Sequence, residues 1–207
     1  MLTKRFFFFI FLFSLLTIST YPSYAQDSQI NITELEQLAN DGDPDAQCYL
    51  ATLYLAGKGV SQDFQKAFEL ATKSAEQGNP HAQGLLGALY VKGLGVEKNS
   101  KKAFIWFKKA AEQGNPLAQS DLAIMYFKGY GTEQDYEQAH KWFQEAAKQG
   151  DSSAQYNLGM MYIKGVGVKK DFNLAINWFE KACENGNTSA CEICTKLDNA
   201  TKSNTKK

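Results

Sequence analysis

The fold is decided by a 36-residue stretch, residues 114–149, that reads GNPLAQSDLAIMYFKGYGTEQDYEQAHKWFQEAAKQ. The same pattern returns at an offset of 36 residues on either side. Its occurrences start at Gly42, Gly78, Gly114 and Gly150, with a partial one at Gly186. A fixed period of about 20 to 50 residues is typical of solenoids, in which each unit buries its apolar face against its neighbours. The sequence therefore predicts a stack of four repeated units.

Each unit is expected to hold two helices. In the quoted stretch Asn115 caps the first helix, Gly129 can take the left-handed conformation that ends it, and Asp135 caps the second. The repeating slots are Ala118, Gln119, Leu122, Ala123 and Tyr126 in the first helix, and Ala139, Trp142, Phe143, Ala146 and Ala147 in the second. Their spacing marks one face of each helix, which is the face expected to pack.

The Gly-x-Gly of each unit is interpreted as a turn. A phosphate-binding loop is the alternative, but the third glycine of the dinucleotide fingerprint is absent and no strand is expected before the motif. The motif therefore predicts a helix end and no nucleotide site.

These motifs carry a family resemblance. The run A-Q-x-x-L-[AG]-x-x-Y-x-x-G-x-G, followed by A-x-x-W-F-x-x-A-A-x-Q-G, resembles the Sel-one-like repeat, a relative of the tetratricopeptide repeat. The resemblance extends from Gly42 to about Leu197 and is weakest in the first unit, where Leu70 and Ala71 replace Trp-Phe. It implies an all-α fold, a right-handed α-solenoid of antiparallel helix pairs, and a role as a protein-interaction scaffold.

The chain divides as follows. We expect a cleavable signal peptide at 1–25, an N-terminal cap helix within 26–41, repeats at 42–77, 78–113, 114–149 and 150–185, a C-terminal cap helix at 186–197 and a disordered tail at 198–207. Thr33 with Glu36 matches a capping box, so Thr33 is predicted as the N-cap of the first cap helix.

The first 25 residues have the pattern of a secretory signal. Lys4 and Arg5 precede an apolar run from Phe6 to Leu16, and small residues stand at Ser23 and Ala25. A retained membrane anchor is the alternative, but this run is short for a span of about 20 residues. We therefore expect a periplasmic or secreted protein that is not stably inserted in a membrane after cleavage.

The charge is almost balanced. Removing Lys4 and Arg5 lowers the 22 basic residues to 20, against 22 acidic residues. The lysines are evenly spread and form no basic stripe, so a nucleic-acid partner is not expected.

The four cysteines all follow the signal segment, and disulfides are usual in a secreted chain. Cys183 and Cys191 both replace the residues of the repeating slots at one joint, and their spacing resembles the bridged pairs of the cysteine-rich secreted branch of the family. This pair is the predicted disulfide. Cys191 and Cys194 also form a CxxC, which could indicate redox or metal chemistry, but no βαβ pattern or nearby histidine supports that. Cys48 and Cys194 are too far apart along the solenoid to pair with each other.

Catalytic chemistry receives little support. His81 and His140 occupy unrelated slots without a repeated acidic or cysteine neighbour. The resemblance to the cysteine-rich branch implies a link to penicillin binding and weak β-lactam hydrolysis, chemistry that uses S-x-x-K with S-D-N and K-T-G. Here S-x-x-K occurs at Ser203 to Lys206, in the expected tail, and the other two motifs are missing. We expect no catalytic residues, no cofactor and no metal site.

The resemblance implies that the first helices line the concave surface, with positions off the repeating face pointing into a groove. The predicted groove residues are Tyr49, His81, Leu85, Lys92, Leu117, Asp121, Ile124, Lys128, Tyr156, Asn157, Met160 and Lys164. They vary between units, whereas the packing slots do not. Ordinary surface positions are the alternative interpretation.

The predicted function is therefore a monomeric scaffold that binds a protein or peptide, preferably one with apolar anchors and some acidic residues. A penicillin-binding or β-lactam-hydrolysing enzyme is the alternative from another class. A structural component of the cell envelope is a third.

Overall fold

The computed structural model describes the backbone of residues 31–204 and the side chains of residues 31–197. Within this part of the chain there are ten helices and no strand. The first helices of the four units are α2 (Pro44–Ala56), α4 (Pro80–Lys92), α6 (Pro116–Lys128) and α8 (Ser152–Lys164). The second helices are α3 (Phe64–Glu76), α5 (Ser100–Glu112), α7 (Tyr136–Lys148) and α9 (Phe172–Glu184), while α1 (Ile32–Asn40) and α10 (Thr188–Asn204) lie at the ends. The signal segment predicted at residues 1–25 falls outside the described residues.

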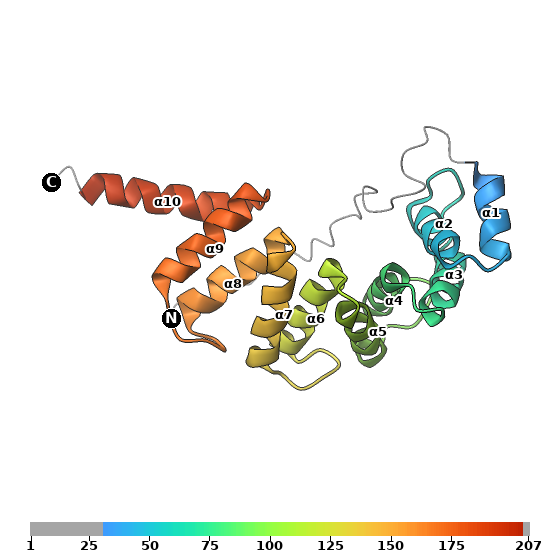
Figure 1. Cartoon of the computed structure of the whole chain (residues 1–207), viewed down its shortest axis with the longest axis horizontal. Coiled ribbons are helices and arrows are strands. Elements are labelled where there is room, and N and C mark those ends of the chain that lie inside the picture. The colour runs from blue at the N-terminus through green and yellow to red at the C-terminus, as the bar shows by residue number, and fades with distance from the viewer. Residues whose placement is uncertain (1–30, 205–207) are drawn as a thin grey trace, which may run out of the picture.

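The helices are arranged in series along an arc (Figure 1). Each first helix packs against the second helix of its own unit and against the second helix of the unit before it. No helix contacts a unit further along the chain to a comparable extent. The all-α solenoid of helix pairs predicted from the sequence is therefore confirmed.

The helix starts follow the predicted capping residues. Asp43, Asn79, Asn115 and Asp151 in the first helices, and Asp63, Asn99, Asp135 and Asp171 in the second, each accept a hydrogen bond from the backbone N–H three residues further on. The prediction for α1 was wrong. Its N-cap is Asn31, whose side chain accepts from the N–H groups of Thr33 and Glu34, so that Thr33 lies inside the helix.

The two glycines that follow each first helix have separate roles. Gly129 ends α6 with a φ of 71°, the left-handed conformation expected of a C-cap glycine. At Gly131, which has a φ of 72°, a Cβ atom would collide with the backbone carbonyl of Ser100 at the start of α5. The motif thus brings two consecutive units into close backbone contact, which supports its interpretation as structural.

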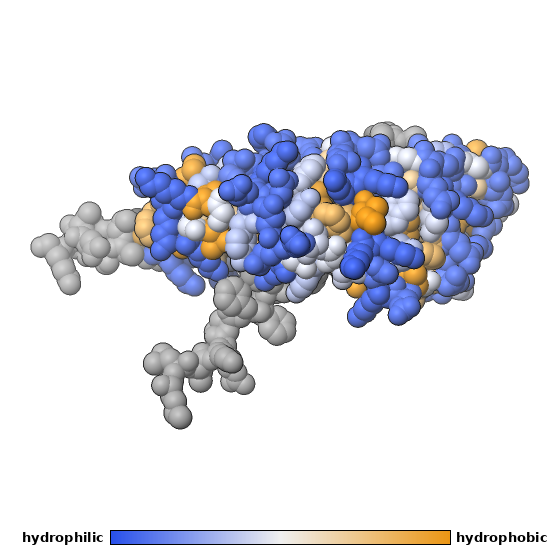
Figure 2. All heavy atoms as spheres, turned by 90° about the horizontal axis from the view of Figure 1, so that it is seen from below, coloured by the Kyte–Doolittle hydropathy of each residue, from blue (hydrophilic) through white to orange (hydrophobic). Residues whose placement is uncertain are grey.

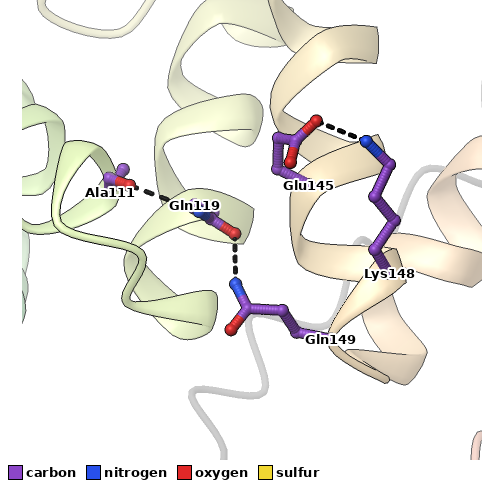
Figure 3. A network of polar contacts seen from close by, with 5 residues as sticks. All are labelled: Ala111, Gln119, Glu145, Lys148 and Gln149. Carbon is purple, nitrogen blue, oxygen red and sulfur yellow. Dashed lines mark hydrogen bonds and ion pairs between the residues drawn. The ribbon is translucent and has the colours of Figure 1, made fainter.

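A buried glutamine ties each first helix to two second helices (Figure 3). The Gln119 amide nitrogen donates to the carbonyl of Ala111 at 3.2 Å, and its amide oxygen accepts from Gln149 at 2.8 Å. Equivalent donor bonds run from Gln47 to Ala39, from Gln83 to Ala75 and from Gln155 to Ala147. The corresponding acceptor bonds come from Gln77, Gln113 and Asn185. We call this series the glutamine ladder.

The predicted disulfide is confirmed. Cys183 at the end of α9 and Cys191 in α10 are bridged, with their Cα atoms 4.7 Å apart. These two positions are the next occurrence, 36 residues on, of the Ala147 and Gln155 positions of the glutamine ladder. A covalent bond therefore stands at the last joint, where the other joints have a hydrogen bond.

The end of α10 and the aromatic residues of the second helices can also be compared with the predictions. Helix α10 continues to Asn204, past Leu197 where the sequence analysis placed its end. Of the aromatic pair in each second helix, the phenylalanines Phe107, Phe143 and Phe179 are fully buried. The tryptophans Trp106, Trp142 and Trp178 are half-buried and pack against the core, as expected for packing residues.

Two glycines of α4 offer a matched test of this packing. A Cβ at Gly87 would lie 2.9 Å from the buried ring of Phe107, whereas at Gly84 its nearest neighbours would be 3.8 Å away. We expect Gly87→Ala to lower the free energy of unfolding by about 1–2 kcal/mol through overpacking. Gly84→Ala should raise it by up to about 1 kcal/mol, because alanine is the better helix former. Urea unfolding of both variants measures this, and equal effects would contradict the packing at Gly87.

The glutamine ladder can be tested at the joint between α9 and α10, by putting its hydrogen bond in place of the disulfide. Cys183→Ala with Cys191→Gln removes the disulfide and replaces it with the glutamine bond of the other units. The matched variant, Cys183→Ala with Cys191→Ala, has neither link. Because one such bond contributes about 1 kcal/mol, amide hydrogen exchange in α10 should be about fivefold slower in the glutamine variant. Equal exchange rates in the two variants would show that the glutamine bond does not hold this joint.

Candidate functional site

The first and second helices differ in what they expose. The second helices carry exposed charged residues along one side, and the lower side of the arc in Figure 1 is mostly hydrophilic with small, separate hydrophobic spots (Figure 2). The first helices are more buried, and several of their exposed or half-buried residues lie along one stripe. We call this the first-helix stripe, made of His81, Ala88 and Lys92 in α4, Leu117, Asp121, Ile124 and Lys128 in α6, and Ser153, Asn157, Met160 and Lys164 in α8.

The predicted groove residues fall into two groups. Tyr49 and Leu85 are only 1% and 8% exposed, so they belong to the core and present no surface to a partner. The other ten are exposed or half-buried; they are His81, Lys92, Leu117, Asp121, Ile124, Lys128, Tyr156, Asn157, Met160 and Lys164. Tyr156 leans on the buried ring of Phe179, with ring centroids 5.6 Å apart, and thus contributes to packing as well.

Both buried residues come from one slot of the repeat, which is shared by Tyr49, Leu85, Asp121 and Asn157. Its large apolar members are buried, whereas its polar members stay half-buried. Side-chain polarity at this slot was the signal that could have separated the two groups, because burying an unpaired polar group is costly.

A cleft of about 170 Å³ opens at the junction of the second and third units, and its lining is mostly apolar. It brings together two predicted groove residues, Asp121 and Ile124. The other lining residues were not predicted from the sequence; they are Val91, Ser100, Phe107, Met125 and Tyr130. A signal existed for Tyr130, which stands between two glycines where the other units have Lys58, Leu94 and Val166.

The electrostatics of the cleft centre on Asp121. Burial raises the pKa of its carboxyl group to about 7, the neighbouring Asp151 adds to the rise, and Lys92 opposes it. Burial also raises the pKa of Asp151, although hydrogen bonds from Ala154 and Ser120 act in the other direction. Two carboxyl groups that are both partly removed from water therefore lie close to one another.

The histidines do not form part of this cleft. His81 lies 3.5 Å from the Asn115 side chain, at the capping position of α6. His140 in α7 lies 3.1 Å from the hydroxyl of Tyr162, and burial lowers its pKa. Over the part of the chain whose side chains are described, no three histidine, cysteine, aspartate or glutamate residues are grouped so as to hold a metal ion.

A comparison with known protein families finds the same 36-residue repeat. The profile of the Sel1 repeat matches residues 44–79, 80–115, 116–151 and 152–187. The chain belongs to the Sel1 repeat family. Proteins of this family are generally non-catalytic repeat scaffolds that bind other proteins. No curated protein matches the sequence.

Several solved structures resemble this Sel1 repeat protein. A protective antigen of uropathogenic Escherichia coli is 39% identical with a TM-score of 0.75, covering 79% of this chain and 35% of its own. A Sel1 repeat protein of Oxalobacter formigenes is 33% identical with a TM-score of 0.72, covering 80% of this chain and 74% of its own. Cysteine rich protein B of Helicobacter pylori is 28% identical with a TM-score of 0.52, covering 66% of this chain and 98% of its own. The chain therefore spans about a third of the antigen's length.

The raised pKa of Asp121 predicts a pH-dependent stability. Its pKa in the folded protein lies above the ordinary 3.8, so the folded state binds more protons than the unfolded chain between about pH 4 and pH 7. The stability contribution of this group is thus complete below pH 4 and is lost as the pH rises through 7. Asp121→Asn should melt a few degrees above the wild type at pH 8 and at the same temperature at pH 4.

The control for this prediction is Glu180→Gln, which removes one exposed carboxylate from α9. Its melting temperature should follow that of the wild type at both pH values. A gain for Asp121→Asn of equal size at pH 4 and pH 8 would argue against a titrating Asp121.

Proposed function

We propose that this Sel1 repeat protein works outside the cytoplasm as a scaffold that binds another protein or a peptide along the concave side of its arc. The first-helix stripe is the proposed contact surface. The assignment is supported by the burial of the packing slots of the first helices, which leaves the stripe among the residues that a partner can reach. The hydrophilic, highly exposed second helices suit the outer side of such an arc.

The observation that carries the proposal is the contrast between constant and variable slots. The packing slots hold nearly the same residues in every unit, while the stripe changes from Leu117 to Ser153 and from Asp121 to Asn157 between neighbouring units. Packing is common to all units, whereas recognition of one partner needs a different contact at each unit.

The composition of the stripe indicates the kind of partner. Ile124 and Met160 occupy the same slot in adjacent units and give the stripe an apolar centre. Lys92, Lys128 and Lys164 share another slot and give it a basic edge. A peptide or protein segment with apolar anchors, carrying acidic residues on the side of the lysines, would complement this surface.

The proposed location rests on two features. The pattern of the first 25 residues is that of a secretory signal, and a disulfide persists best in an oxidising compartment. No helix in the described part of the chain is long and apolar enough to cross a bilayer. We propose that the protein acts as a monomer in the periplasm or outside the cell.

The proposal is tested by a charge placed in the apolar centre of the stripe. Ile124→Asp with Met160→Asp should abolish capture of a partner from envelope and culture-fluid extracts while leaving the helical circular dichroism unchanged. We expect an affinity loss of at least about a hundredfold, since two apolar contacts are replaced by charges that the partner would have to desolvate. Mass spectrometry identifies the partner, and titration of the purified pair measures the loss.

Ile105→Asp is the matched control, because Ile105 in α5 is 52% exposed and lies outside the stripe. It should retain the partner. Equal binding by the wild type and the double variant would remove the stripe as the contact surface. Saturable binding of a labelled β-lactam with no protein partner would favour the enzyme alternative.

A further inference from the structure

The cleft between the second and third units has the size of a subsite for one side chain. Its volume of about 170 Å³ is below the few hundred cubic ångströms usual for a small-molecule pocket. Three elements form it, with Val91 from α4, Ser100 and Phe107 from α5, and Ile124 from α6. Asp121 and Ile124 belong both to this cleft and to the first-helix stripe. A partner lying along the stripe would therefore pass over its opening.

Asp121 supplies the carboxylate in this mostly apolar lining. Its carboxylate receives no hydrogen bond from any described residue, and its nearest carboxyl neighbour, Asp151, repels it. Asp151, by contrast, is hydrogen-bonded as the cap of α8 and by the Ser120 hydroxyl, which lies 3.4 Å away. A partly buried carboxylate without a donor is costly to keep ionised, and a cation placed beside it would offset that cost.

The described residues supply only part of this positive charge. Lys92 on α4 lies near enough to lower the pKa of Asp121, but burial and Asp151 outweigh it, because the net pKa is raised. Above pH 7, where Asp121 is mostly ionised, negative charge at the opening of the cleft is therefore only partly compensated by Lys92. Charge complementarity selects a positively charged occupant.

We propose that the cleft at Asp121 receives one basic side chain of the bound partner, with its apolar stem against Ile124 and Val91 and its cationic head at the Asp121 carboxylate. This inference rests on the proposed function, since it concerns one position of the partner that lies along the stripe. Arginine suits the cleft better than lysine. Its guanidinium is more weakly hydrated, can pair with a carboxylate through two hydrogen bonds, and stacks on aromatic faces such as that of Tyr130.

The partner so described has a mixed pattern of charge. An acidic residue faces the lysine edge of the stripe, and a basic residue flanked by apolar ones enters the cleft. Because the two charges lie at different slots, their order along the partner would fix its direction and register.

The test uses benzamidine, a flat aromatic cation, and benzamide, a neutral molecule of nearly the same shape. Both are titrated into the purified protein carrying labelled methyl groups, and chemical shifts of the Ile124 and Val91 methyls are followed at pH 8. We expect benzamidine to shift these methyls with an affinity at least about tenfold above that of benzamide, the factor that corresponds to about 1.4 kcal/mol. Equal affinities would overturn the proposal.

Two variants assign the effect to the cleft. Asp121→Asn should remove the preference for benzamidine, and Ile105→Asp, which lies outside the cleft, should keep it. A preference that survives in Asp121→Asn would place the cation elsewhere and overturn the proposal. The wild-type preference should also shrink between pH 8 and pH 5.5 as Asp121 becomes protonated, with Asp151 and Lys92 the charged groups that face it from α8 and α4.

These results separate the subsite from the scaffold. Suppose that the protein binds benzamidine and benzamide equally well, while the Ile124→Asp, Met160→Asp variant still loses its partner. The proposal of a cleft for a basic side chain is then wrong, and the proposed scaffold function is retained. If the double variant keeps its partner, the scaffold surface itself is wrong, whatever benzamidine does.

Discussion

The structure depends on a buried amide that satisfies two neighbours at once. Gln119 donates to the carbonyl of Ala111 in α5 and accepts from Gln149 at the end of α7, so one side chain of α6 links three helices from two units. A buried polar group contributes to stability only when its hydrogen bonds are made, and a misplaced glutamine would be penalised. The glutamine ladder therefore fixes the register between units in a way that apolar contacts, which have no direction, do not.

At the last described joint a disulfide takes the place of this link. Among the described residues α10 packs mainly against α9, so a glutamine at the Cys191 position would make its donor bond but would find no following second helix there for the acceptor bond. The Cys183–Cys191 disulfide joins the same two slots without needing a further unit. Closing so short a loop stabilises the joint by about 2–3 kcal/mol, more than the single hydrogen bond it replaces.

Much of the fold could be predicted because every unit repeats the same local signals. Caps such as Asp135, helix-ending glycines such as Gly129 and the helical spacing of apolar slots act within one or two turns, and repetition averages out local ambiguity. The disulfide could be predicted because both cysteines depart from the repeat at one joint. At α1 no repeat supports the local signal, and the capping box predicted Thr33 as the N-cap, whereas the structure has Asn31 there.

The site was harder to predict because it depends on contacts between units. The 36-residue period places Tyr49 and Asp121 at one slot, yet Tyr49 is buried and Asp121 lines a cleft. Their polarity separates the two side chains, but the neighbouring helices form the cleft. The cleft needs Val91, Phe107 and Tyr130, which come from different helices and a loop, and no short-range pattern joins them. The same constraint explains where recognition can evolve in such a stack. Slots held by the ladder and by Phe143 cannot change without disturbing two joints, so sequence variation collects on the stripe and in the clefts beside it.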